Sequence, residues 1–274
     1  MEKIVYATGT SGTIGRHIHG LVTPLNLRLD FLDNFEFSDL VMSRNLLIHF
    51  AGIVGYRSSE KNENHSRKIN IESTTVLAKK ALEAGIGKFV FVSTAHVYKS
   101  SNSPLSETSV ISPINEYAEQ KFEAEEELRD IFKFAEEKLC IVRVFGVLDW
   151  DMKPDTLGGA IKSLVHSNFS ERINFGLDIR DFLTPQRIAR TILAISRLPD
   201  LYGVVNLCSG REVSVKQAVA IMLKKSNLLF KDSFVNMNCS DTPVIVGNNS
   251  KLLTYFPDFK MDWSPSNYKI ENEN

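Results

Sequence analysis

The start of the chain constrains its fold more than any other stretch. The apolar residues Ile-Val-Tyr-Ala at 4–7 lead directly into Thr8-Gly9-Thr10-Ser11-Gly12-Thr13-Ile14-Gly15, where glycine recurs at every third position. This order indicates a strand, a glycine turn and a helix start, because glycine permits a sharp turn and the close approach of a bound group. Free N–H groups at a helix start favour a phosphate. The spacing predicts a dinucleotide-binding turn, but a glycine triplet alone is a common pattern and requires a second signal.

Composition excludes several classes of function. The 274 residues are 43% hydrophobic and 24% charged with a formal net charge of -1, which gives no basis for binding nucleic acid or a membrane surface. The N-terminus lacks the pattern of a secretory leader, and no window approaches 18 apolar residues, so we expect a cytoplasmic protein. Cys140, Cys208 and Cys239 lack metal-site spacing, and the histidines do not cluster in sequence. We therefore expect free thiols and no metal.

Strand-like and helix-like segments alternate through roughly the first 145 residues. Continuous apolar runs are typical of parallel strands buried on both faces, and they occur at 45–51, 88–93 and 139–145, with a further predicted strand at 27–32. Helical periodicity is found at 66–84 and 116–137, and a short helix is expected at 16–22. This alternation predicts an α/β fold with a doubly wound parallel sheet over residues 1–150.

The remaining residues, 151–274, have a more mixed pattern. Helices are predicted at 156–168, 184–197 and 214–225, and short strands near 203–208 and 243–247. Ligands of open α/β sheets bind beyond the carboxyl ends of the strands, so we expect a small lobe over that crevice. Some of these segments are expected to return to the main domain.

Thr94, Tyr117 and Lys121 supply the second signal. Thr94 follows the predicted strand 88–93, and Tyr117 and Lys121 are one turn apart on the predicted helix 116–137. A phenol is a poor base at neutral pH, but a nearby ammonium group favours phenolate, and a hydroxyl can hold the reacting oxygen. The three residues suit proton transfer at a carbinol oxygen while hydride leaves or arrives at its carbon.

With these motifs the chain resembles the extended short-chain dehydrogenases/reductases, the NAD-dependent epimerase/dehydratase family, and is similar to nucleotide-sugar 4-ketoreductases and 4-epimerases. The resemblance covers roughly residues 3–255. It implies a Rossmann-like domain with a small C-terminal substrate lobe, NAD(H) or NADP(H) as cofactor and a nucleotide-sugar substrate. Besides the glycine turn, the matching residues are His49-Phe50-Ala51-Gly52, Asn70, Ser93-Thr94-Ala95-His96-Val97-Tyr98, Tyr117-Ala118-Glu119-Gln120-Lys121, Arg143-Val144-Phe145-Gly146, Arg180-Asp181-Phe182 and Asn206-Leu207-Cys208-Ser209-Gly210.

The resemblance also implies individual roles. Tyr117 would be the acid/base, Lys121 would bind the nicotinamide ribose and lower the pKa of the tyrosine, and Thr94 would hydrogen-bond the substrate oxygen. Arg180 matches the arginine that pairs with the phosphates of the sugar nucleotide; a solvated arginine in a turn is the alternative. The candidate substrate-binding residues are Thr94, His96 and Arg180. The candidate cofactor-binding residues are Gly9, Thr10, Ser11, Gly12, Thr13, Ile14, Gly15, Asp30, Phe31, Ala51, Gly52, Asn70, Tyr117 and Lys121.

Two departures from the family pattern bear on function. In the resembled family, a segment between the glycine turn and the counterpart of Asp30 carries the acidic residue that binds the ribose 2′-hydroxyl. This chain has only a short stretch between Gly15 and Asp30 and lacks that segment, so the choice between NAD and NADP stays open. Asp30 and Phe31 are expected in the adenine pocket, and Arg16 or Arg28 could meet a 2′-phosphate. Ala95-His96 replaces the Asp-Glu pair of sugar-nucleotide dehydratases, which disfavours dehydration. His96 is expected to border the pocket.

We therefore predict an NAD(P)-dependent oxidoreductase that acts on a nucleotide-activated sugar, with 4-ketoreduction ranked ahead of epimerisation because the lobe is short. The alternatives are a nucleotide-sugar epimerase, a non-catalytic dinucleotide-binding protein, and a reductase of a non-sugar ketone. A homodimer through the helices at 66–84 and 116–137 is a further expectation from the resemblance. The acidic run Glu123, Glu125, Glu126 and Glu127 indicates instead a solvated face.

Overall fold

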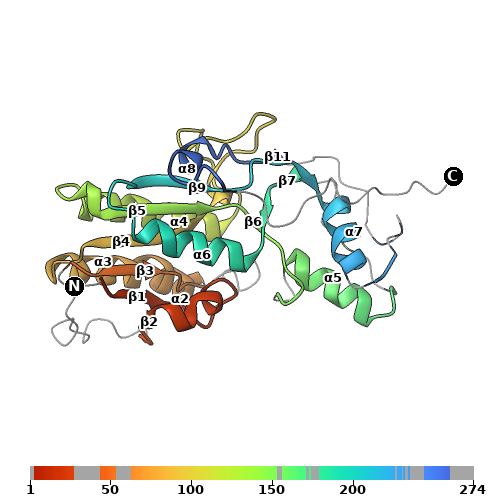
Figure 1. Cartoon of the computed structure of the whole chain (residues 1–274), viewed down its shortest axis with the longest axis horizontal. Coiled ribbons are helices and arrows are strands. Elements are labelled where there is room, and N and C mark those ends of the chain that lie inside the picture. Colours follow the sequence, from red (N-terminus) through yellow and green to blue (C-terminus); the bar gives the residue numbers. More distant parts are fainter. Residues whose placement is uncertain are drawn as a thin grey trace. The chain divides into compact units, whose positions relative to one another are not determined.

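A computed structural model of the whole chain describes residues 3–27, 44–53, 63–152, 156–170, 173, 179–225, 227–229, 231, 234 and 244–259. The chain divides into two compact units (Figure 1). The first unit comprises residues 1–99, 109–144 and 185–207, and the second comprises 100–108, 145–184 and 208–274. The expected boundary at residue 150 falls shortly after Phe145, where the chain enters the second unit.

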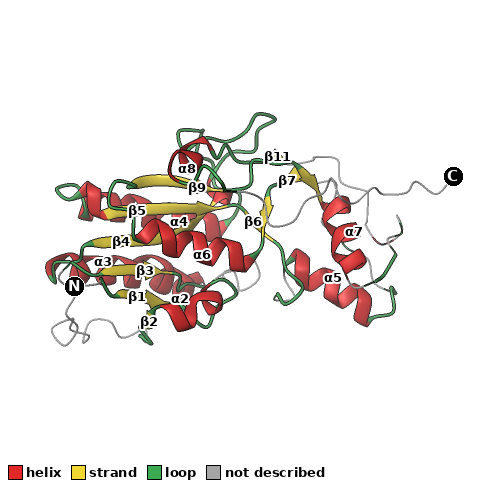
Figure 2. Ribbon diagram, viewed as in Figure 1, coloured by secondary structure: helices red, strands yellow, loops and turns green. Residues whose placement is uncertain are grey.

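The first unit is built on a parallel sheet (Figure 2). Its described strands, in the order β2-β1-β3-β4-β5-β9, are β2 (Thr23–Pro24), β1 (Val5–Thr8), β3 (Leu46–His49), β4 (Lys88–Thr94), β5 (Leu139–Val144) and β9 (Gly203–Leu207). Every residue of β1, β3, β4 and β5 is buried, as the continuous apolar runs predict. The predicted α/β class and parallel sheet are therefore confirmed. Because all the strands run in one direction, residues that follow β1, β3 and β4 meet at the same edge.

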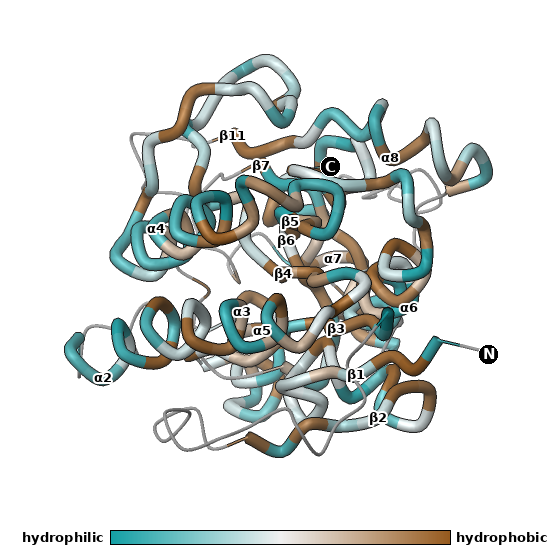
Figure 3. Tube along the Cα trace, turned by 90° about the vertical axis from the view of Figure 1, so that its left-hand side faces the viewer, coloured by the Kyte–Doolittle hydropathy of each residue, from teal (hydrophilic) through white to brown (hydrophobic). Residues whose placement is uncertain are grey.

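Helices cover both faces of this sheet. In Figure 3, α3 (Ser73–Glu83) and α4 (Glu116–Ile131) lie on one side of the strands, and α6 (Pro185–Ser196) lies on the other. The 3-10 helix η1 (Gly15–Leu21) packs against α6, and α4 packs against β4, β5 and the short η5 (Ala95–Val97). Brown, hydrophobic stretches predominate along the strands, and α4 has teal, hydrophilic stretches. With helices on both of its faces, the sheet has the doubly wound arrangement that the sequence predicts.

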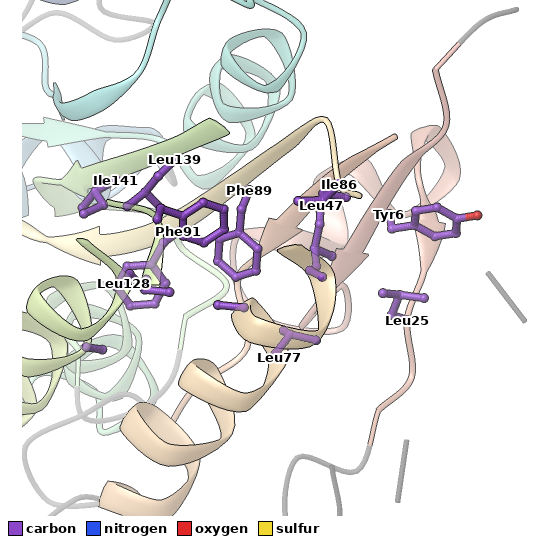
Figure 4. Packing of buried hydrophobic residues seen from close by; sticks show 14 residues of the cluster. Tyr6, Leu25, Leu47, Leu77, Ile86, Phe89, Phe91, Leu128, Leu139 and Ile141 are labelled. Atoms are coloured by element: carbon purple, nitrogen blue, oxygen red, sulfur yellow. The ribbon is translucent and has the colours of Figure 1, made fainter. Parts of the chain in front are cut away.

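The core between the sheet and the α3/α4 layer is aliphatic and aromatic (Figure 4). Phe89 and Phe91 project from β4 onto this face, where Leu77 of α3 and Leu128 of α4 cover them. The ring of Phe132 lies 5.8 Å from that of Phe89, centroid to centroid. Since strand residues of equal parity share a face, alternate β4 positions make this contact.

Three predicted elements differ in extent from the structure. The helix expected at 116–137 ends at Ile131, because buried Phe132 packs on Phe89 and the chain turns before η6 (Glu136–Lys138) and β5. The helix expected at 66–84 is three consecutive pieces: α2 (Glu63–Arg67), the π-helical turn η4 (Lys68–Glu72) and α3. It ends before Gly85, whose φ of 78° suits the predicted C-cap.

The third difference concerns the first crossover. The expected helix at 16–22 is a single 3-10 helix of 7 residues, and the strand beside β1 is β2 at Thr23–Pro24. Of the strand predicted at 27–32, Leu27 is irregular and the other residues lie outside the described part of the chain.

The second unit contains short strands and three described helices: α5 (Leu157–His166), α7 (Val215–Lys225) and α8 (Ser250–Tyr255). β7 (Ile179–Arg180) lies between β10 (Val213–Ser214) and β11 (Val244–Ile245), and β6 (Gly146–Val147) pairs with β8 (Phe182–Leu183). Residues from α5, α7 and β8 form its own hydrophobic core, so the unit has an independent packing centre. In the described residues of either unit, we find no helix both long and apolar enough to cross a membrane.

Candidate functional site

The glycine turn after β1 requires glycine at two of its three positions. Gly9 has a φ of 68°, and a Cβ there would lie 2.6 Å from the backbone nitrogen of Ala51. A Cβ on Gly15 would lie 2.4 Å from the carbonyl oxygen of Gly9. Both contacts are shorter than real Cβ atoms make, so side chains here would displace the backbone. Exposed Gly12, by contrast, would bring its Cβ no closer than 3.2 Å, to the Gly9 oxygen.

His49 joins β1, β3 and α3 beneath this turn. The Nδ1 atom of buried His49 lies 2.7 Å from Thr8 Oγ1, and its Nε2 atom lies 3.0 Å from Thr74 Oγ1. Thr8 Oγ1 also accepts a hydrogen bond from the Ala51 N–H at 3.3 Å. A neutral imidazole satisfies both contacts, because it donates through one ring nitrogen and accepts through the other. His49 thereby fixes the chain where Ala51 follows β3.

Burial, together with the smaller effect of the positive charge of Lys121, lowers the pKa of His49 to about 3. The unfolded chain binds a proton at this side chain below about pH 6.5, whereas the folded protein does not. Stability from this group is therefore present above pH 6.5 and is lost as the pH falls toward 3. We expect the free energy of unfolding of the wild type to fall about 2 kcal/mol more than that of His49→Gln between pH 7.5 and 5. Urea unfolding at several pH values measures the difference, and parallel curves would contradict the assignment.

Asn70 fixes the segment that follows Ala51. Its Oδ1 atom accepts a hydrogen bond from the Ile53 N–H at 2.8 Å, and its Nδ2 atom donates to the Ile53 carbonyl at 3.1 Å. Nδ2 also donates to Gln120 Oε1 on α4 at 2.8 Å. A Cβ on Gly52 would lie 3.0 Å from Asn70 Oδ1, so the two residues are in close contact. Asn70 sits in the π-helical turn η4, and its contacts hold the residues after β3.

Thr94, Tyr117 and Lys121 lie on β4 and α4 of the first unit. Thr94 ends β4, and its Oγ1 accepts a hydrogen bond from the His96 N–H at 3.2 Å, which leaves its own hydrogen available to donate. Asn115 caps α4 by accepting from the Ala118 N–H at 2.9 Å, so Tyr117 stands in the first turn. Tyr117 is partly exposed, while Lys121 is buried with its Nζ atom 4.0 Å from the centre of the Phe91 ring.

The direction of one expected pKa shift is wrong. Lys121 was expected to lower the pKa of Tyr117, but burial raises the pKa of that phenol above its ordinary value. Burial also lowers the pKa of Lys121, to about 7, and the nearby Glu125 carboxylate opposes this shift. Desolvation disfavours the charged forms of both groups, the phenolate and the ammonium. Tyr117 is therefore a protonated acid at neutral pH.

The cradle around the glycine turn fits a dinucleotide. Gly9 brings the turn against Ala51, and Ser11 and Gly12 are exposed at its outer side, where backbone can approach a pyrophosphate. Thr10 is buried, whereas Thr13 and Ile14 are partly exposed. The expected adenine-pocket residues Asp30 and Phe31, and also Arg28 and Cys239, lie outside the described residues. Cys140 and Cys208 are buried free thiols. In the part of the chain that the structure describes, no His, Cys, Asp and Glu cluster could hold a metal ion.

Arg180 belongs to the second unit and lies on β7. Its backbone pairs with Val213 on one side and Ile245 on the other, so two neighbouring strands hold it. The next residue, Asp181, is fully buried and accepts hydrogen bonds from the N–H groups of Ser209 and Gly210, each at 2.7 Å. His96 lies in the 3-10 helix η5, two residues after Thr94, and is partly exposed. Arg180 and His96 stay candidate substrate-binding residues.

The acidic run on α4 is only partly solvated, because Glu125 is fully buried. Its carboxylate receives hydrogen bonds from Arg143 of β5: Nη2 lies 2.5 Å from Oε2, and Nε lies 3.0 Å from Oε1. Ser93 Oγ donates to Oε1 at 2.5 Å. Sequence reasoning missed this pair, although the spacing of Tyr117, Lys121 and Glu125, each four residues from the next, puts all three on one helix face.

Comparisons with known proteins agree with this geometry. The model of the NAD dependent epimerase/dehydratase family matches residues 5–208. The chain is 26% identical to the uncharacterized UDP-glucose epimerase YtcB of Bacillus subtilis (strain 168), over 92% of each protein. It is also 26% identical to a UDP-glucose 4-epimerase of Rhizobium leguminosarum bv. trifolii, over 78% of this chain and 73% of that protein.

A solved structure shows the same fold. MoeE5 in complex with UDP-glucose and NAD superposes with a TM-score of 0.77 at 19% identity, over 95% of this chain and 94% of that one. The family match covers most of the chain, including the glycine turn, Thr94, Tyr117 and Lys121. The protein therefore belongs to the NAD-dependent epimerase/dehydratase family, within the extended short-chain dehydrogenases/reductases.

Proposed function

We propose that the protein catalyses oxidation and reduction at C4 of a UDP-linked sugar, with 4-epimerisation as the net reaction. The observation that carries the proposal is the set of Thr94, Tyr117 and Lys121 at the β4 end and on α4. Relatives matched over most of their length, a UDP-glucose epimerase and a UDP-glucose 4-epimerase, support the substrate class. The sequence analysis ranks 4-ketoreduction ahead of epimerisation. Because both of these relatives are named as epimerases, we place epimerisation first in the proposal.

The chain's own groups would handle the proton and the orientation of the sugar. Bound NAD supplies the acceptor and donor of hydride. Tyr117 exchanges a proton with the C4 oxygen, and the Thr94 hydroxyl donates a hydrogen bond to the same oxygen. The Lys121 ammonium stabilises the phenolate that forms on Tyr117 when the proton leaves. Thr8, Gly9, Ala51 and Asn70 would hold the cofactor in place.

Reduction of a 4-keto sugar is the second candidate, favoured by one observation. Because burial keeps Tyr117 protonated at neutral pH, its hydroxyl is ready to protonate a carbonyl oxygen as hydride arrives. Epimerisation instead begins with removal of a proton, which requires the phenolate. The two candidates therefore differ in the protonation state from which turnover starts.

One experiment separates the candidates. Purified protein is incubated with UDP-glucose or UDP-galactose and NAD without added reductant, and the sugar nucleotides are resolved by chromatography. In parallel, NADH or NADPH absorbance is followed with a 4-keto nucleotide sugar and with a neutral ketone. Interconversion without net cofactor consumption supports epimerisation, and consumption with the 4-keto sugar supports reduction. Cofactor binding without turnover of any substrate would leave the non-catalytic alternative, and preference for the neutral ketone would reject a sugar substrate.

The glycine turn provides a test of cofactor binding alone. We expect Gly12→Val to fold, because its Cβ meets only the Gly9 oxygen at 3.2 Å, but to bind NADH at least about tenfold more weakly, because the side chain projects where a pyrophosphate would lie. Calorimetric titration with NADH measures the affinity. Gly20→Val is the control, since a Cβ at Gly20 meets nothing within 4 Å. Equal affinity in the Gly12 and Gly20 variants would contradict the binding site.

A further inference from the structure

The buried carboxylate of Glu125 has three cationic or hydroxyl partners from two strands and its own helix. Arg143 binds it through Nε and Nη2, and Ser93 donates to Oε1 at 2.5 Å. Arg129 Nη2 approaches Oε2 at 3.2 Å from the more exposed side. The side chains of Glu125 and Arg143 are 0% and 2% exposed. Buried ion pairs are weak evidence for stability, because the cost of desolvation offsets their attraction. A role in placing other groups therefore has to be considered.

The same carboxylate is connected to the candidate catalytic residues through both elements that carry them. Lys121 and Glu125 stand on one face of α4, where Lys121 covers Phe91 and Glu125 bonds Ser93. Phe91 and Ser93 share a face of β4, because strand residues two apart point the same way. Lys121 and Glu125, one helix turn apart, thus contact two β4 residues that are two positions apart, Phe91 and Ser93. Ser93 directly precedes Thr94.

Arg143 extends the connection to the next elements. Its guanidinium carbon lies 4.7 Å from the centre of the Tyr98 ring, and the Tyr98 hydroxyl donates to Asn206 Oδ1 on β9 at 2.7 Å. Tyr98 directly follows η5, the turn that begins after Thr94. Both ends of that turn are therefore tied to the Glu125–Arg143 pair, one through Ser93 and the other through Tyr98.

We propose that Glu125 is a positioning residue for the reaction: bonded to Ser93 and neutralised by Arg143, it sets the register of α4 on β4 that presents Tyr117 and Lys121 to the oxygen bound by Thr94. This inference rests on the proposed function of those three residues. The Glu125 carboxylate also has an electrostatic effect, because its negative charge, one helix turn from Lys121, favours the protonated amine. Among the described residues, neutral His49 on β3 also interacts with the charge of Lys121, and Tyr117 lies one turn before Lys121 on α4.

Two substitutions separate positioning from a contribution to stability alone. Ser93→Ala removes the bond between strand and helix but leaves the ion pair, and Glu125→Gln keeps the shape while removing the charge. The control is Glu126→Gln, whose exposed carboxylate also pairs with Arg129. We expect Ser93→Ala to lower kcat by about tenfold or more, because small displacements of reacting groups are costly, with KM and NADH affinity changed less than about twofold. Glu126→Gln should keep kcat within about twofold of the wild type.

The charge is tested without turnover. In lysine labelled with ¹³C and ¹⁵N, the Lys121 resonance is assigned by its disappearance in Lys121→Met and titrated by NMR. A carboxylate favours the protonated amine, so its loss in Glu125→Gln should lower the titration midpoint by about one pH unit or more, and Glu126→Gln should leave it unchanged. The descending limb of the pH profile of kcat should move to lower pH in the same variant.

Failure of this inference is distinguishable from failure of the proposed function. If the wild type turns over no sugar nucleotide, the proposed function fails and the Lys121 titration alone decides the role of Glu125. An unchanged midpoint in Glu125→Gln, or an unchanged kcat in folded Ser93→Ala, would overturn the inference. Should Glu125→Gln not fold, Ser93→Ala decides, because it leaves no charge unpaired.

Discussion

Tyr117→Phe is expected to lower turnover by about 10²–10⁴-fold while the fold and cofactor binding persist, because only the transferable proton is removed. Tyr117 is in the first turn of α4, partly exposed, and its pKa is raised by burial, so the phenol is the protonated form that delivers a proton. Steady-state kinetics on the nucleotide sugar that the turnover experiment selects, together with NADH titration, measures both properties.

The matched control is Tyr202→Phe, which removes a phenol from an exposed side chain that is 48% accessible. This control should retain wild-type kcat. If Tyr117→Phe kept more than roughly a tenth of the wild-type rate, an acid/base role of the expected size would be excluded. Equal losses in both variants would point to a general effect of tyrosine removal on folding.

Arg180→Ala is expected to reduce kcat/KM for a nucleotide sugar by a factor corresponding to about 2–5 kcal/mol, if the guanidinium pairs with the substrate diphosphate. Arg180 is partly buried on β7, between two strands, and the neighbouring Asp181 carboxylate ties the adjoining loop to it. A support of this kind suits a group that must hold a phosphate in one orientation. NADH affinity should hardly change.

Arg180→Lys restores the charge but not the bidentate fork, so it should recover activity only in part. Arg211→Ala, an exposed arginine of the same unit, is the control and should behave as wild type. Kinetics are compared on UDP-, dTDP- and GDP-linked sugars and on a neutral ketone. Equal loss on charged and neutral substrates in Arg180→Ala would remove the phosphate role and weaken the assignment of a sugar nucleotide.

The central strands and the glycine turn could be predicted because local pattern determines them. A strand buried on both faces must be continuously apolar, so β3, β4 and β5 can be recognised without tertiary information. The requirement for glycine at Gly9 is local in part, since its left-handed φ disfavours a side chain, and the close approach of Ala51 adds a tertiary reason. Motif order then identified Thr94, Tyr117 and Lys121 as candidates.

Glu125 and the pKa of Tyr117 could not be predicted in this way. Four glutamates within five positions are typical of a solvated helix face, and only the tertiary position of Arg143 on β5 reveals that one of them is buried. Likewise, spacing places Lys121 near Tyr117, but desolvation, which depends on everything packed around both groups, decides the direction of the shift. The pairing of Thr23–Pro24 with β1 was also missed, because a strand of two residues is too short to give a periodic pattern.

The brevity of β2 has a consequence for association between molecules. Among the described strands, β2 stands at one end of the sheet, where unpaired N–H and C=O groups can recruit a strand from another chain. The strand contributes only two residues, and Pro24 has no N–H to offer. A neighbouring polypeptide would therefore find too few donors there to extend the sheet. Among the described strands, the edge formed by β2 is therefore poorly suited to edge-to-edge aggregation.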